Sequence, residues 1–311
     1  MKIRNLQSSA RHLLLALTVI LAGGSIQGAA NAQTPAQGYR IHISVDMEGL
    51  TGAVSPNQII GNGNDYAATR KIMVGEILAA IEGAREAGAT EFVIVDSHGG
   101  MENILIDELP EDVTLIRGQG RPFGMMEGID RGRYDGAMFI GYHASASNMR
   151  GVRAHTISSA RFSEVKLNGV PAAEGYINAA VAGEYGVPIL LVTGDDATVD
   201  ELAPLKAEGV AVKRAIGFHS AESLTPAAAR KLIKDAARRS VSRISSYKPF
   251  KIAGPANIDV TFHYYRPAEM LSWLPIVERI GPRTVRFKGK TVSEAAKILG
   301  FASGYNVELE P

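Results

Sequence analysis

Residues 39–49 read YRIHISVDMEG and join a strand pattern to a pair of carboxylates. The part before Asp46 is rich in β-branched side chains, which is typical of a strand within a sheet. Asp46 and Glu48 follow at its carboxyl end, and side chains two residues apart point the same way if the strand extends that far. Two adjacent carboxylates repel each other unless a proton or a cation lies between them. This stretch therefore indicates a strand that ends in an ion site.

Two further apolar runs end in side chains of the same kind. Residues 92–95 are followed by Asp96 and His98, and residues 138–142 are followed by His143. In open α/β sheets, ligand sites form at the carboxyl ends of the strands. We therefore expect these side chains to meet at one edge of a sheet.

The rest of the chain alternates between strand and helix patterns, which predicts an α/β fold. The sheet should be mostly parallel and doubly wound, with helices on both faces. A connector at 247–255 separates residues 39–248, the expected metallohydrolase domain, from a smaller C-terminal α+β portion, 249–311. The expected strands are 39–45, 91–95, 113–116, 137–142, 187–192, 210–215, 258–262 and 283–287. The expected helices are 66–87, 173–185, 199–207, 225–245, 267–274 and 292–299.

The amino end of the chain has the pattern of an export signal. Three basic residues precede an apolar run at 13–22, and small residues at 30–32 form a cleavage pattern. The run is shorter than the ~20 residues that a permanent membrane helix needs. We therefore expect a cleaved signal over 1–32, a linker over 33–38, and a periplasmic or secreted protein without a stable membrane span.

The composition excludes some partners and limits the kind of metal site. Without the expected signal, the chain has 30 basic and 32 acidic side chains, and no basic stripe is interleaved with aromatic residues. This argues against a nucleic-acid partner. The chain has no cysteine, so a zinc site must be built from imidazoles and carboxylates.

Each candidate residue alone also has an ordinary explanation. Asp46 or Glu48 could cap a turn, and His98 could lie in a loop without a role. His143 could be a packed histidine, and Glu174 begins an expected helix, where the helix dipole favours a carboxylate. Their expected convergence at one edge is what favours a zinc hydrolase over these explanations.

Five segments of this chain resemble the motif set of the bacterial D-aminopeptidase family, and they follow one another in the order in which they are named at the end of this paragraph. The resemblance is strong from residue 39 to 196 and thins to an overall pattern afterwards. The chain departs from the family's pattern by about one extra residue within 147–150 and by the export signal, and the extra residue bears first on substrate preference. The five segments are 44–49, 96–98, 141–144, 169–175 and 194–196.

The resemblance implies a zinc aminopeptidase that acts on short peptides through a metal-activated hydroxide. It implies two zinc ions per chain, with Asp46 as the bridge between them, and a large homo-oligomer that encloses its sites. The implied ligands are Asp46, Glu48, His98, His143 and Glu174.

The resemblance also implies a further histidine beside the metals, and His155 matches it. It could donate a proton to the leaving amine or stabilise the intermediate, and a nucleophilic role ranks below these two. Asp96 and Asp195 could orient ligating imidazoles, or could instead cap a turn or a helix. Asn178, one turn after Glu174, is a further candidate behind the ligands.

Other functions remain open from the residues alone. An exported solute-binding protein would share the fold class and the signal, although five ligand-type residues at one edge argue against it. A phosphoesterase uses similar two-metal chemistry, and an L-aminopeptidase or dipeptidase would differ only in its pocket walls.

Overall fold

The computed structural model describes residues 38–304. The expected signal and all but the last residue of the expected linker lie outside the described residues. Within residues 38–304 the strands form a mostly parallel sheet of seven strands and an antiparallel sheet of five. The predicted α/β class with a C-terminal α+β portion is therefore confirmed. In this same range, no helix is both long and apolar enough to cross a bilayer.

The larger sheet has the strand order β3-β2-β1-β4-β7-β8-β9. All neighbouring pairs are parallel except β8 with β9, which closes one edge as an antiparallel hairpin. The strands are β1 (Tyr39–Val45), β2 (Ala89–Asp96), β3 (Val113–Ile116), β4 (Gly136–Ile140), β7 (Ile189–Asp195), β8 (Glu208–Gly217) and β9 (Ser220–Ser223).

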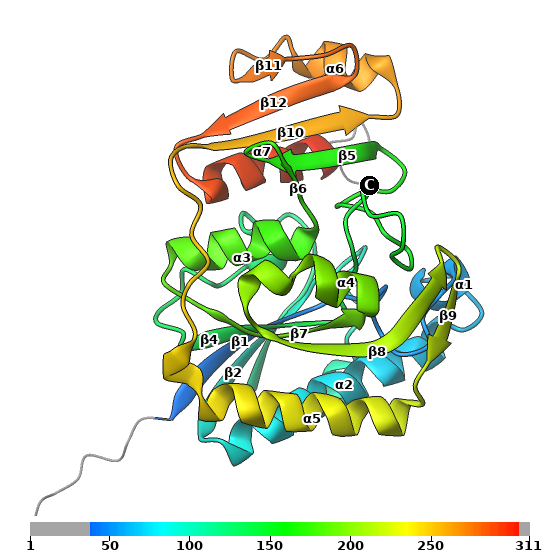
Figure 1. Ribbon diagram of the computed structural model, residues 1–311, viewed down its shortest axis with the longest axis vertical. Helices are drawn as coiled ribbons and strands as arrows, with labels where there is room; N and C mark the ends of the chain where they lie inside the picture. Colours follow the sequence, from blue (N-terminus) through cyan, green and yellow to red (C-terminus); the bar gives the residue numbers. More distant parts are fainter. Residues whose placement is uncertain (1–37, 305–311) are drawn as a thin grey trace, which may run out of the picture. The chain divides into compact units, whose positions relative to one another are not determined.

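Helices cover both faces of this sheet, as expected for a doubly wound fold (Figure 1). On one face, Ile41 and Ile43 of β1 pack in a core with α2 and α5. On the other face, Phe139 of β4 packs in a core with α3 and with Leu202 at the end of α4. The helices are α1 (Pro56–Ile59), α2 (Tyr66–Glu86), α3 (Glu174–Glu184), α4 (Asp196–Glu201) and α5 (Pro226–Ser242).

The smaller sheet has the order β11-β12-β10-β5-β6 and draws strands from two parts of the chain. Helix α7 packs on β10 and β12 and also contacts α3, whereas α6 contacts β10, β11 and β12 (Figure 1). Its elements are β5 (Phe162–Leu167), β6 (Val170–Pro171), β10 (Ala256–Phe262), α6 (Tyr265–Leu271), β11 (Val277–Arg279), β12 (Thr284–Gly289) and α7 (Val292–Gly304).

The smaller sheet also crosses the boundary expected at residue 248. Strands β5 and β6 lie between β4 and α3 in the chain, yet β5 pairs with β10 beyond that boundary. Residues 249–304 therefore do not form a self-contained portion, because their sheet is completed by two strands from the preceding part.

Candidate metal centre

Three neighbouring parallel strands bring the predicted ligands together. Strand β1 pairs with β2 on one side and β4 on the other, with Val45 level with Asp96 and Ile140. The amide of Asp46 donates to the Ile140 carbonyl at 2.8 Å, and that of Ser97 donates to the Val45 carbonyl at 2.9 Å. This register places the segments after β1, β2 and β4 at one sheet edge. The amino end of α3 adds Glu174.

The six predicted site residues form one continuous cluster. His98 Nδ1 lies 3.1 Å from Asp46 Oδ1 and 2.9 Å from Glu48 Oε2. His143 Nε2 lies 3.3 Å from Asp46 Oδ2 and 3.4 Å from Glu174 Oε2. The two oxygens of Asp46 thus face different histidines, which is the arrangement a bridging carboxylate needs.

His155 completes the cluster on the side of Glu174. Its Nε2 lies 3.9 Å from Glu174 Oε1, and its ring stacks on that of His143 with centroids 4.0 Å apart and planes 8° apart. Its side chain is 15% exposed, whereas the side chain of His143 is 1% exposed. His155 is therefore the histidine of the cluster that most readily meets an incoming molecule.

Each of these histidines is oriented by a backbone carbonyl. His98 Nε2 lies 2.6 Å from the Ile59 carbonyl, and His143 Nδ1 lies 3.0 Å from that of Ala144. His155 Nδ1 lies 2.8 Å from the Arg153 carbonyl. A carbonyl only accepts, so the proton of each neutral ring is placed on this nitrogen. With a metal bound in place of a proton, the other ring nitrogen would present its lone pair to that metal, as a ligand must.

Two groupings of these side chains have the spacing of a metal site. In each, the ligand atoms lie within 4.8 Å of one another: Asp46, Glu48 and His143 in one, and His143, His155 and Glu174 in the other. His143 Nε2 is buried and makes no hydrogen bond, although two carboxylates lie within 3.4 Å of it. A buried nitrogen without a hydrogen bond is costly, and a cation between it and the carboxylates would satisfy it. The residues therefore fit a bound metal.

The charges of the buried cluster depend on one another. Burial raises the pKa of Asp46, and the neighbouring Glu48 carboxylate raises it further. Burial also acts to raise the pKa of Glu48, but the charge and hydrogen bond of His98 hold it well below its ordinary value. Burial acts to lower the pKa values of His98 and His143, yet the facing carboxylates hold both well above the ordinary value. Protons on the imidazoles thus balance the carboxylates, and a divalent cation would displace those protons.

The three residues predicted behind the ligands have other partners than a histidine ring. The Asp96 carboxylate accepts from the Asn103 amide at 2.5 Å and from the Ile104 amide at 2.7 Å. Asp195 caps α4 by accepting from the Thr198 amide. The orienting role expected for both carboxylates is filled by the backbone carbonyls, and the alternative of a turn and a helix cap describes them better.

Asp195 and Asn178 still contribute to the surroundings of the cluster. The second oxygen of Asp195 accepts from the Val152 amide at 2.7 Å and so anchors the segment that carries His155. Asn178 donates to the Tyr142 hydroxyl at 3.0 Å, and that hydroxyl donates to Ser44 Oγ at 2.7 Å. This buried network lies beneath the ends of β1 and β4.

Sequence reasoning missed two buried charged residues next to the cluster. Glu76 of α2 is 0% exposed and Lys213 of β8 is 3% exposed, and both contact the turn that follows Asp46. A lysine in a strand and a glutamate in an amphipathic helix are ordinarily solvent-facing. The sequence around them carries no signal of burial.

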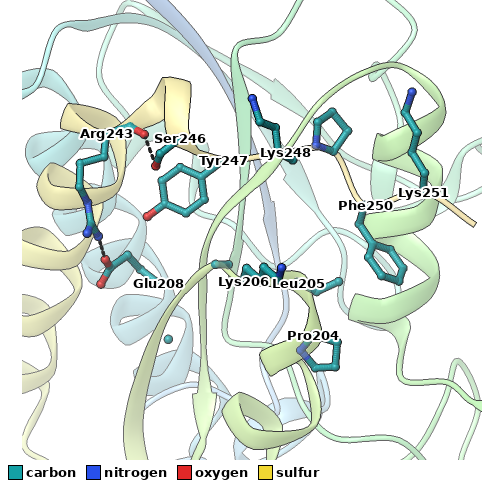
Figure 2. Close-up of a pocket in the computed structure, with 13 residues that line it drawn as sticks. Pro204, Leu205, Lys206, Glu208, Arg243, Ser246, Tyr247, Lys248, Phe250 and Lys251 are labelled. Carbon is teal, nitrogen blue, oxygen red and sulfur yellow. Dashed lines mark hydrogen bonds and ion pairs between the residues drawn. The ribbon is translucent and has the colours of Figure 1, made fainter.

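A separate pocket of about 640 Å³ lies at the opposite edge of the larger sheet. Its lining includes Glu208, which begins β8, Arg243 after α5, and Phe250 (Figure 2). Arg243 is paired with Glu208 there. The pocket lies at the amino ends of the strands, whereas the cluster lies at their carboxyl ends, so the two are distinct.

Comparisons with known proteins agree with the cluster. A family model described as D-aminopeptidase matches residues 39–301. A D-aminopeptidase of Bacillus subtilis (strain 168) is 34% identical over 260 residues, which cover 82% of this chain and 93% of that protein. The chain also resembles the solved structure of the Zn-dependent D-aminopeptidase DppA from Bacillus subtilis, described as a self-compartmentalizing protease. That match has a TM-score of 0.79 and 32% identity and covers 84% of this chain and 95% of that chain.

These matches confirm the resemblance drawn from the five motifs. They favour a peptidase over the solute-binding protein and the phosphoesterase considered above. The match spans both sheets, because it extends from β1 to α7. The chain belongs to the D-aminopeptidase family.

Proposed function

We propose that this chain is an exported aminopeptidase that uses two zinc ions to remove N-terminal D-residues from short peptides. The observation that carries the proposal is the pairing of three carbonyl-anchored imidazoles with three buried carboxylates at one sheet edge. Family membership and the zinc dependence of the Bacillus subtilis relative support the choice of metal and substrate.

The proposed ligands divide into two sets that share Asp46. His98 and Glu48 lie on the side of Asp46 Oδ1, and His143 and Glu174 lie on the side of Asp46 Oδ2. When bound, a pair of zinc ions supplies Lewis acidity toward water and the scissile carbonyl. The chain's own residues hold the ions, exclude bulk water by their burial, and move the protons.

We assign proton transfer to His155. Because its Nδ1 is held by the Arg153 carbonyl, its Nε2 is the nitrogen that can gain or release a proton. Protonated at Nε2, His155 gives this proton to the leaving amine, which would otherwise depart as an amide anion, and solvent water restores the proton to Nε2. The spacing of His155 from His143 and Glu174 also suits a metal ligand, and this alternative gives a different mutant phenotype, described below.

The proposal extends to location and assembly. Export rests on the signal pattern of residues 1–32, and it predicts a mature protein that begins near Gln33 by mass spectrometry of material from its host. Recovery of the full-length chain from the host cytosol would contradict it. Assembly rests on the relative described as a self-compartmentalizing protease. It also rests on exposed apolar side chains on and after α6, where Trp273 is 72% exposed.

The direct test pairs metal analysis with a substrate screen. Protein purified without chelator should contain about two zinc ions per chain, and it should cleave D-aminoacyl peptides faster than matched L-peptides. The screen includes p-nitrophenyl phosphate as a control for phosphoesterase activity. Protein that lacks zinc and gains no peptidase activity on zinc addition would refute the proposal.

A further inference from the structure

A buried lysine holds the turn that carries one of the proposed ligands. Lys213 Nζ donates to three backbone carbonyls: those of Glu48 at 2.5 Å, Leu50 at 3.0 Å and Ala53 at 2.6 Å. These three acceptors satisfy all three N–H groups of the ammonium. Residues 48–53, named here the ligand turn, are thus gathered around a single charged atom.

A buried glutamate holds the same turn through its donors. Glu76 Oε1 accepts from the amide of Thr51 at 2.9 Å and from its hydroxyl at 2.7 Å. Glu76 comes from α2 and Lys213 from β8, so two elements distant in the chain clamp the ligand turn. Lys213 supplies the ammonium group that donates to the carbonyls, and Glu76 supplies the carboxylate that accepts from the amide.

The ligand turn also lies directly against the strand end that precedes His143. The amide of Gly49 donates to the Gly141 carbonyl at 2.8 Å. A Cβ atom at Gly49 would lie 1.8 Å from the Tyr142 carbonyl oxygen, so only glycine fits there. A shift of the turn would therefore disturb Glu48 and His143 together.

Charge at these two positions has a cost that a purely structural role would not require. Burying an ammonium and a carboxylate removes both from water, and apolar side chains of similar size often stabilise a fold as well or better. Such side chains could not hold four backbone groups of one turn in place. The pair is thus better explained by the need to hold the turn still.

We propose that Lys213 and Glu76 are positioning residues that fix the ligand turn so that Glu48 and Asp46 retain zinc. The inference rests on the metal site proposed above. Neither residue contacts the cluster histidines in the hydrogen bonds of the described chain. They act through the backbone of the turn, and no proton transfer is assigned to them.

The test measures how fast zinc leaves folded protein. Full-length wild type, Lys213→Met and Thr51→Val are loaded with zinc, and zinc transfer to a chromogenic chelator is followed below the unfolding temperature. Loss of a partner behind the ligands commonly weakens metal binding by ~10–100-fold. We expect release from Lys213→Met to be faster by about that factor. Thr51→Val should show a smaller acceleration, and kcat on a D-aminoacyl peptide should fall in the same order.

The matched control is Val212→Ala, the neighbouring position in β8. Val212 is fully buried in the same apolar core as Leu50, but no hydrogen bond of the described residues joins it to the ligand turn. Its truncation should lower thermal stability and leave zinc release at the wild-type rate. Wild-type release rates in both Lys213→Met and Thr51→Val overturn this inference while the metal site stands. If Lys213→Met does not fold, Thr51→Val decides alone against Val212→Ala. Wild type without zinc overturns the metal site and this inference with it.

Discussion

His155 is the residue whose role a single substitution resolves. With proton transfer at Nε2, His155→Ala should keep its zinc while kcat on peptides falls by ~10²–10⁴, the usual range for general acid–base catalysis. An interaction made mainly in the transition state lowers kcat and kcat/KM equally. Zinc content and steady-state kinetics on one preparation give both quantities.

A substrate with a different leaving group then distinguishes the possible functions of His155. A D-aminoacyl nitroanilide releases an amine that barely needs a proton, so acid catalysis predicts near-normal turnover of this substrate by His155→Ala. An equal defect on both substrates points to stabilisation of the intermediate. Loss of zinc with activity identifies His155 as a ligand, and wild-type kinetics would remove it from the site.

The protonation of His42, which is not part of the cluster, makes the stability of the fold depend on pH. Burial lowers the pKa of His42 to about 4, and the charges of Arg40 and Arg121 oppose its protonation. Between pH 6.5 and pH 4 the unfolded chain binds a proton that the folded chain does not. Stability therefore falls as the pH falls through this window, by up to about 3 kcal/mol at its lower end.

Replacement of His42 by glutamine measures this contribution. Gln can still donate to the Glu127 carbonyl, which His42 Nε2 contacts at 3.1 Å, but it does not titrate. His42→Gln should lose less stability than wild type between pH 7 and pH 5 in denaturant unfolding. Parallel losses in the two proteins would show that His42 does not carry the effect.

At the scale of elements, the strand ends were predictable because the evidence for them is local. Strand β1 begins and ends as its pattern predicts, and the ligands follow β1, β2 and β4 as expected. The helix expected over 199–207 is shorter: α4 ends at Glu201, and a 3-10 turn around Pro204 follows. Proline lacks the amide that would continue the α-helical hydrogen bonds.

The strands that the sequence did not predict depend on contacts between residues distant in the chain. Strand β5 mixes apolar and charged residues without strict alternation, and its partner β10 lies beyond the boundary expected at residue 248. Strands β6, β9 and β11 have four residues or fewer and lack the apolar run that made β3, of the same length as β9, predictable. The same limit applies to Lys213, whose burial depends on carbonyls from another strand end.

Asp195, which caps helix α4, gives a further testable prediction. Asp195→Ala removes the cap, at a cost of about 1 kcal/mol, and also frees the Val152 amide that anchors the His155 segment. We expect kcat to fall while zinc content is retained. Thr225→Ala is the control, because Thr225 caps α5 through the Ala228 amide and makes no hydrogen bond to a cluster residue within residues 38–304.

Thermal unfolding and steady-state kinetics of Asp195→Ala and Thr225→Ala test whether Asp195 supports activity. Asp195→Ala should lose more stability than Thr225→Ala, because it also leaves the buried Val152 amide without its acceptor. Below both unfolding temperatures, only Asp195→Ala should lose activity. Equal kcat values in the two variants would show that Asp195 is a cap and nothing more.

At the scale of the whole molecule, the exposed side chains around α6 predict self-association. Tyr264 is 72% exposed and Tyr265 63% exposed, and Ile276 is 60% exposed. Large apolar groups gathered in this way commonly mark protein interfaces. Wild type should sediment as an oligomer at micromolar concentration, and Trp273→Asp should shift it toward smaller species. A monomeric wild type would rule out assembly through this surface.

The path of the chain through the smaller sheet also bears on protein synthesis. Strands β5 and β6 lie between His155 and Glu174, and the Ala172 amide, just before α3, donates to the Val165 carbonyl of β5 at 2.9 Å. The ribosome releases all six cluster residues well before it releases β10, the strand that pairs with β5. Translation must therefore continue through β10 before the support of the cluster is complete. A polypeptide released early would carry every ligand but lack the strand that braces the segment between two of them.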